Sequence, residues 1–131
     1  PDVYVDFTLN LNDVQFSTLT SIGSSAIITS ATNNFGSRAA GYDNNGIIVY
    51  RANFDGDYPE FYAYDRTCPH DFETNALSVK VSVDFTEAFC PQCSTRYALS
   101  SSGMPISGPG KYYLKNYKTY FSGFSVRVWN H

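Results

Sequence analysis

The sequence predicts an all-β domain, and two observations support this prediction. The composition is 17% aromatic and only 16% charged, and aromatic and β-branched residues mixed with turn formers are typical of strands. Apolar residues alternate with polar ones in several segments, whereas the common helix formers never cluster with a period of about 3.6 residues. Roughly ten short strands with turn-rich connections favour an antiparallel sandwich or barrel.

The clearest strand signal is the alternation over 77–85, in which apolar and polar side chains take turns along the whole segment. The segment 33–46 is rich in Asn and Gly, and 100–110 in Ser, Gly and Pro, so we expect loops there. Tight turns are expected at Asp55-Gly56-Asp57 and around Ser122-Gly123. In chain order, the predicted strands are 3–11, 26–29, 47–52, 61–66, 77–85, 95–99, 114–121 and 124–129.

The length of 131 residues predicts a single domain, 1–131, without a repeat or a linker. A net charge of -3 argues against a nucleic-acid partner, since phosphate binding needs a basic surface. No apolar run is long enough to span a membrane, although a lipid or N-terminal anchor upstream of Pro1 is compatible with a sequence that does not begin with Met. The composition, rich in Tyr, Asn and Ser and poor in Lys, favours an extracytoplasmic location, in the periplasm or at the cell surface.

All three cysteines and one of the two histidines lie between positions 68 and 93. They form two short groups, Cys68-Pro69-His70 and Cys90-Pro91-Gln92-Cys93, separated by 19 residues. Thiolates and an imidazole at close spacing are the ligands that zinc and iron–sulfur sites use. An insert of this size can return the chain so that the two groups converge as facing loops. The sequence therefore predicts a metal site at Cys68, His70, Cys90 and Cys93.

Other classes of function remain open at this point. The cysteines can be ordinary buried residues, or Cys90 and Cys93 can form a disulfide or a thiol–disulfide redox pair. A thioredoxin-like pair would open a helix, whereas 94–99 reads as a strand. A hydrolytic triad would need a histidine outside the cysteine motif. A binding module is a further alternative, and its candidate contact residues are Tyr112, Tyr113, Tyr117 and Tyr120.

The motif resembles that of the Rieske family. The family pattern is Cys-x-His, a variable insert, and then Cys-Pro-x-His, often followed by Gly-Ser-x-Tyr/Phe. The sequence reads Cys68-Pro69-His70 and then Cys90-Pro91-Gln92-Cys93-Ser94-Thr95-Arg96-Tyr97. A downstream Gly-Pro loop is also typical, and Gly108-Pro109 is similar to it. The resemblance implies a Rieske-like antiparallel fold with a small inserted metal-binding lobe at about 66–110.

The resemblance also implies a role for each residue. Cys68 and Cys90 would hold the inner iron of a [2Fe–2S] cluster, and His70 with the residue at position 93 would hold the outer one. The cofactor-binding residues Thr95 and Tyr97 stand where a hydroxyl donates to a cluster sulfur and a phenol to a cysteine sulfur. Such bonds stabilise the reduced cluster. Tyr97 reads equally well as a core aromatic of a strand.

Position 93 departs from the family, since it is Cys where the pattern has His, and Ser94 replaces the expected Gly. Three forms of the site follow. They are a three-Cys, one-His [2Fe–2S] cluster with a potential toward roughly -400 mV, a Zn site of the Cys₃His type, and a metal-free site. The implied function is one-electron transfer to an unidentified redox partner protein, without catalysis of its own. The alternative is a zinc-bound or metal-free extracytoplasmic binding module.

Overall fold

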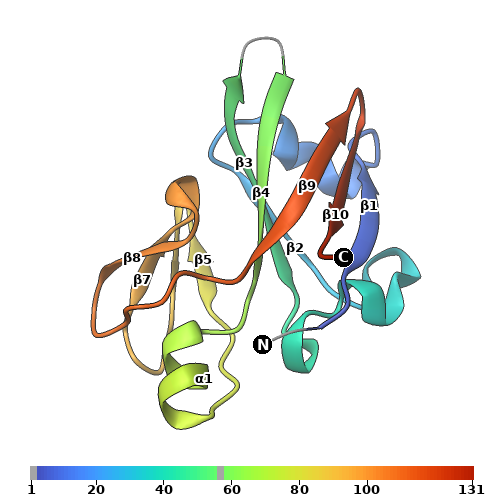
Figure 1. Ribbon diagram of the computed structural model, residues 1–131. Helices are drawn as coiled ribbons and strands as arrows, with labels where there is room; N and C mark the ends of the chain where they lie inside the picture. Colours follow the sequence, from blue (N-terminus) through green and yellow to red (C-terminus); the bar gives the residue numbers. More distant parts are fainter. Residues whose placement is uncertain (1–2, 56–57) are drawn as a thin grey trace.

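The computed structural model describes residues 3–55 and 58–131, which form ten strands in two antiparallel sheets (Figure 1). The large sheet has the order β1-β10-β9-β4-β3-β2, and the small sheet has the order β5-β6-β7-β8. The predicted all-β fold is therefore confirmed. The strands are β1 Asp6–Asn10, β2 Ser25–Ile28, β3 Ile47–Asp55, β4 Tyr58–Asp65, β5 Ser82–Asp84, β6 Glu87–Phe89, β7 Arg96–Ala98, β8 Met104–Ser107, β9 Asn116–Ser122 and β10 Ser125–Trp129.

The large sheet buries one face of its strands, as the alternating pattern predicts. Val5, Phe7 and Leu9 are buried, and Phe7 and Leu9 lie opposite Val128 and Val126 of β10. Short 3-10 helices lie in the long connections, and two of them add to this core: η1 contributes buried Phe16 and Leu19, and η3 contributes buried Ala39. These helices are η1 Val14–Thr20, η2 Thr32–Asn34, η3 Gly36–Ala39 and η4 Tyr42–Asn44.

Two hairpins complete the large sheet. β3 and β4 pair from Ile47 opposite Asp65, with an irregularity between Arg51 and Phe54. The predicted turn Asp55-Gly56-Asp57 includes residues 56–57, which lie outside the described residues. β9 and β10 pair from Ser122 opposite Ser125, where Gly123 has a φ of 71° and permits the tight turn.

The small sheet belongs to a lobe inserted between β4 and β9, which lies to one side of the large sheet in Figure 1. The lobe has its own core, formed by Cys68, Cys90, Tyr97, Leu99 and their neighbours. Side chains of β3 and β4 join this core, and the phenol of buried Tyr64 donates to the carbonyl of Leu99 at 2.5 Å. The predicted small lobe is present, and it packs against side chains of β3 and β4 of the large sheet.

Several predicted elements of the lobe are wrong. The strand expected over 77–85 is reduced to β5, preceded by a single bridge between Thr67 and Lys80. Val81 is fully buried, whereas Leu77 is 44% and Phe85 86% exposed, so only part of this alternation faces a core. The segment 100–110, expected to be a loop, contains the last two residues of the 3-10 helix η5 Leu99–Ser101 and the whole of β8.

A short helix, α1 Pro69–Asn75, was not predicted. Pro69 occupies its first position, where the missing N–H costs nothing, and Ala76 ends it in the left-handed conformation. At seven residues it is too short to give a helical period in the sequence. Within the described ranges, no helix has the length and apolar character that crossing a bilayer requires.

Candidate metal centre

The first half of the site is the turn 68–72, here called the first turn. Cys68 follows β4 and is the residue that precedes α1. Its N–H donates to the carbonyl of Val79 at 2.8 Å, and its own carbonyl accepts from the N–H of Phe72 at 3.1 Å. Pro69 fixes the backbone at the start of the helix. The Cys68 side chain is therefore held in the interior of the lobe.

The second half is the turn 90–94, here called the second turn, which connects β6 to β7. The carbonyl of Cys90 accepts from the N–H of Ser94 at 2.9 Å, and the N–H of Cys90 donates to the carbonyl of Thr95 at 2.9 Å. Ser94 has a φ of 67°. Glycine adopts this conformation at least cost, which gives a reason for the Gly that the Rieske pattern has at this position.

The two turns bring four potential ligands together: Cys68, Asp71, Cys90 and Cys93, whose ligand atoms all lie within 4.8 Å of one another. The Sγ atoms of Cys68 and Cys93 are 3.7 Å apart, and the thiol of Cys90 donates to Oδ2 of Asp71 at 2.9 Å. Cys68 and Cys90 are fully buried and Cys93 is partly buried. No disulfide links the three cysteines.

Three of the four predicted ligands therefore meet, and the fourth does not. His70 is partly buried on α1, and it is not part of the group. In its place stands Asp71, which is only 1% exposed and which the sequence analysis did not select. The signal was in the spacing, because Cys68 and Asp71 are three residues apart, as Cys90 and Cys93 are.

Thr95 and Tyr97, the two residues expected to donate hydrogen bonds, are fully buried beside the cysteines. The phenol oxygen of Tyr97 is 3.3 Å from Sγ of Cys68. Oγ1 of Thr95 accepts from the thiol of Cys93 at 3.2 Å. Both side chains lie on or next to β7, so this short strand positions them on the cysteines of both turns.

The loop after β8 covers Thr95. The N–H of Gly110 donates to Oγ1 of Thr95 at 2.9 Å. A Cβ atom at Gly108 would lie 2.7 Å from Cα of Thr95, and one at Gly110 would lie 2.7 Å from its Cγ2. Only glycine permits so close an approach. The Gly108-Pro109 segment singled out in the sequence therefore packs directly onto the second turn.

Burial raises the pKa of the Cys90 thiol, and its hydrogen bond to Asp71 raises that pKa further. Burial also raises the pKa of Cys68, against the opposing effect of its bond with Tyr97. Burial and the neighbouring cysteine raise the pKa of the Tyr97 phenol in turn. Reactive dithiols have lowered pKa values instead, and the second turn leads into β7 rather than a helix. The geometry argues against a thiol–disulfide redox pair.

A cavity of about 240 Å³ lies beside the first turn, lined by residues that include Pro69, Tyr112 and Tyr113. Tyr112 and Tyr113 are each about half exposed and Tyr120 is 63% exposed, whereas Tyr117 is buried. The phenol of Tyr117 donates to Oδ2 of Asp65 at 2.7 Å. The four tyrosines that suggested a binding face therefore do not act alike, because Tyr117 belongs to the core.

Comparisons with known proteins identify the fold. No family model and no curated protein matches the sequence. Among solved structures, the ferredoxin of carbazole 1,9a-dioxygenase from Nocardioides aromaticivorans IC177 has a TM-score of 0.55 at 15% identity, over 99% of this chain and 100% of that one. The Sphingomonas yanoikuyae B1 ferredoxin has 0.51 at 16%, over 87% and 94%.

A third similar chain comes from the complex of reduced oxygenase and oxidized ferredoxin in carbazole 1,9a-dioxygenase, with a TM-score of 0.53 and 19% identity, over 85% of this chain and 84% of that one. At these identities the likeness concerns the fold. It confirms the Rieske-like antiparallel architecture that the sequence motif implies.

Proposed function

We propose that this protein is a one-electron carrier whose redox centre is iron bound by Cys68, Cys90 and Cys93. The observation that carries the proposal is the convergence of three thiols, with all ligand atoms of the site within 4.8 Å, in the lobe of a fold shared with ferredoxins. Thiolates are the ligands that iron–sulfur and other soft-metal centres require.

The residues around the cysteines suit a metal centre. The backbone N–H of Cys93 acts to lower the pKa of the Cys90 thiol, and the backbone N–H of Asp71 acts to lower the pKa of the Cys68 thiol. Such donors, with the phenol of Tyr97, stabilise negative charge on thiolates. Burial of Cys68 and Cys90 excludes water from the sulfur atoms. Iron bound here would supply the one-electron redox change.

A [2Fe–2S] cluster is the cofactor that the Rieske resemblance implies, and it would need His70 to turn inward as the fourth ligand. Electron transfer then needs a partner protein, and the ferredoxin seen with its oxygenase in the carbazole system supports this kind of partnership. The extracytoplasmic location inferred from composition stays a prediction, which fractionation of expressing cells would test.

A second candidate is a structural zinc site, and a specific observation favours it. Four ligand atoms within 4.8 Å have the compactness of a closed tetrahedral site around one ion. Zinc has no redox chemistry at such a site, so the protein would then be a stable binding module and no electron carrier.

Metal and sulfide analysis of protein purified without oxygen, with a visible spectrum, separates these functions. Iron with thiolate-to-iron absorption that bleaches on reduction supports the electron carrier. One zinc per chain without colour contradicts it. Cys90→Ser should abolish the absorption and loosen the lobe, because ligand loss removes metal-linked folding energy. Gln92→Ala, an exposed position in the same turn, should leave both unchanged. Full absorption in Cys90→Ser would contradict the ligand assignment.

A further inference from the structure

The first turn and the second turn have the same construction, although they come from different parts of the lobe. Each begins with a cysteine followed by a proline. Each is closed by a hydrogen bond from the N–H of its fifth residue to the carbonyl of its cysteine, at 3.1 and 2.9 Å. The fourth residues, Asp71 and Cys93, are therefore equivalent, and so are the third residues, His70 and Gln92.

The side chains at the fourth positions cross between the turns in the same way. Asp71 of the first turn contacts Cys90, the leading cysteine of the second, with Oδ2 2.9 Å from Sγ. Cys93 of the second turn contacts Cys68, the leading cysteine of the first, with the sulfur atoms 3.7 Å apart. The side chains at the third positions are not among the four converging ligands.

From this equivalence we propose that Asp71, and not His70, is the fourth ligand, and that the two turns hold a single divalent ion in a Cys₃Asp site. The proposal rests on the metal site of the proposed function but not on electron transfer. A metal–sulfur bond of about 2.3 Å places two thiolates at tetrahedral corners roughly 3.8 Å apart. The Cys68–Cys93 distance of 3.7 Å fits that edge.

The burial of Asp71 points the same way. A carboxylate removed from water needs a cation or several hydrogen-bond donors. Asp71 is 1% exposed, and it takes part in none of the ion pairs found among the described residues. A divalent ion between the two turns would supply the missing positive charge. Two irons bridged by sulfides would instead separate the ligands into two pairs, which a set within 4.8 Å does not show.

Cobalt(II) titration tests the proposal, since this ion colours strongly in tetrahedral thiolate sites and its bands report on the ligands. The wild-type chain should bind one cobalt. Asp71→Ala should weaken binding at least 100-fold, since losing a ligand should exceed the roughly 10–100-fold loss seen for its supporting residues. Asp71→Cys should keep one cobalt and shift the bands to lower energy. His70→Ala and its matched control Gln92→Ala, the equivalent third position, should leave affinity and spectrum unchanged.

Circular dichroism establishes whether each variant is folded. If Asp71→Ala does not fold, Asp71→Cys tests the proposal in its place. A folded Asp71→Cys chain that binds no cobalt would overturn the proposal. A loss of cobalt affinity in His70→Ala, together with unchanged affinity in Asp71→Ala, would overturn it as well. Two irons and two sulfides per chain in the native protein would overturn it too, while leaving electron transfer in place. One zinc per native chain would contradict electron transfer and leave the Asp71 assignment standing.

Discussion

The phenol oxygen of Tyr97 lies 3.3 Å from Sγ of Cys68, and neither side chain has any exposed surface. A phenol in this position donates to a metal-bound thiolate, because the thiolate has no proton of its own. The bond is stronger in the reduced state, which carries more negative charge. In the proposed iron centre, Tyr97 would set the potential rather than hold the metal.

Tyr97→Phe should therefore lower the midpoint potential of the iron-loaded protein. A net bond of about 1 kcal/mol corresponds to about 40 mV for a one-electron couple, and a potentiometric titration measures the change. Tyr64→Phe is the matched control, since it removes another buried phenol, one that bonds to the carbonyl of Leu99. If Tyr97→Phe and Tyr64→Phe have the same midpoint potential, the hydrogen bond of Tyr97 does not act on the metal.

Gly108→Ala should weaken metal binding through Thr95. Gly108 has a φ of 88°, and an added Cβ would meet Cα of Thr95 at 2.7 Å, so the second turn would have to shift. We expect a loss of affinity of about tenfold or more, measured by competition with a chelator. Gly123→Ala is the control, since its φ is 71° with nothing within 4 Å of the added atom. Both substitutions place alanine at a positive φ. Equal losses of metal affinity in the two variants would therefore attribute the effect to backbone strain and not to the contact with Thr95.

Asp65→Asn should lower the free energy of unfolding by about 2–3 kcal/mol. Buried Asp65 accepts from the N–H of Tyr42 at 2.8 Å and the phenol of Tyr117 at 2.7 Å through Oδ2, and from the N–H of Thr67 at 2.9 Å through Oδ1. An amide cannot accept on both sides. Urea denaturation measures the change, and exposed Asp43→Asn should stay within about 0.5 kcal/mol of the wild type. A similar loss of unfolding free energy in both variants would mean that the hydrogen bonds of Asp65 do not stabilise the fold.

The parts of the fold that the sequence predicts correctly are those where one face of a strand meets the large core. The period of two in 3–11 places Val5, Phe7 and Leu9 inside, and they are inside. The period over 77–85 misleads because the lobe is small. Only Val81 of that segment is fully buried, and pairing stops after a few residues. Alternation reports a half-buried surface, and in this lobe too few partner strands exist to make one.

The site shows a similar division. The cysteines are identified from composition and spacing, because all three of them lie in two short groups between positions 68 and 93. Asp71 is missed because carboxylates at the surface are common and its burial depends on how α1 packs. His70 is selected because an imidazole close to three cysteines is a typical metal ligand, and the Rieske pattern also has a histidine at this position. The local geometry that decides between them, the position of each residue in the first turn, follows from hydrogen bonds that no spacing rule contains.

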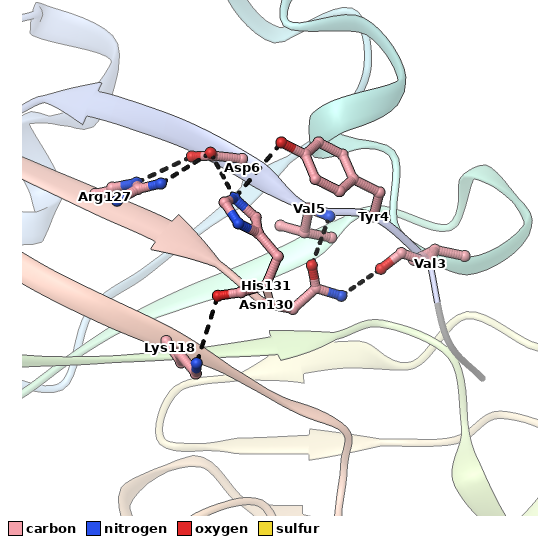
Figure 2. Close-up of polar contacts among 8 residues, drawn as sticks. All are labelled: Val3, Tyr4, Val5, Asp6, Lys118, Arg127, Asn130 and His131. Carbon is pink, nitrogen blue, oxygen red and sulfur yellow. Dashed lines mark hydrogen bonds and ion pairs between the residues drawn. The ribbon is translucent and has the colours of Figure 1, made fainter.

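A polar network joins β1, an edge strand of the large sheet, to its neighbour β10. Asp6 of β1 accepts two hydrogen bonds from the guanidinium of Arg127 of β10, at 3.0 and 2.9 Å (Figure 2). The ring of His131 lies 2.9 Å from Asp6 and stacks on Tyr4 at 5.1 Å between centroids. These bonds, those from Arg127 foremost, hold the pKa of the Asp6 carboxyl well below its usual range.

Asp6→Asn should therefore remove an acid-dependent part of the stability. Because the pKa of Asp6 is lower in the folded state than in the unfolded state, the ionised carboxyl stabilises the fold above pH of about 4. This contribution is lost as the pH falls toward the folded-state pKa. Since Arg127 is 43% exposed, solvent screens the pair, and we expect the melting temperature at pH 7 to fall by only about 2–3 °C.

Melting temperatures of both proteins between pH 2 and 7 check this expectation, because the two curves should converge in acid. Added salt should narrow the gap at pH 7, as screening predicts for an exposed pair. Asp13→Asn is a suitable control: the pKa of Asp13 is also lowered, by its bonds to Gln15, but those partners are neutral and exposed. The difference in melting temperature between Asp13→Asn and the wild type should depend less on salt than the difference for Asp6→Asn. A gap between Asp6→Asn and the wild type that stays constant down to pH 2 would mean that the network stabilises the strands by packing rather than by charge.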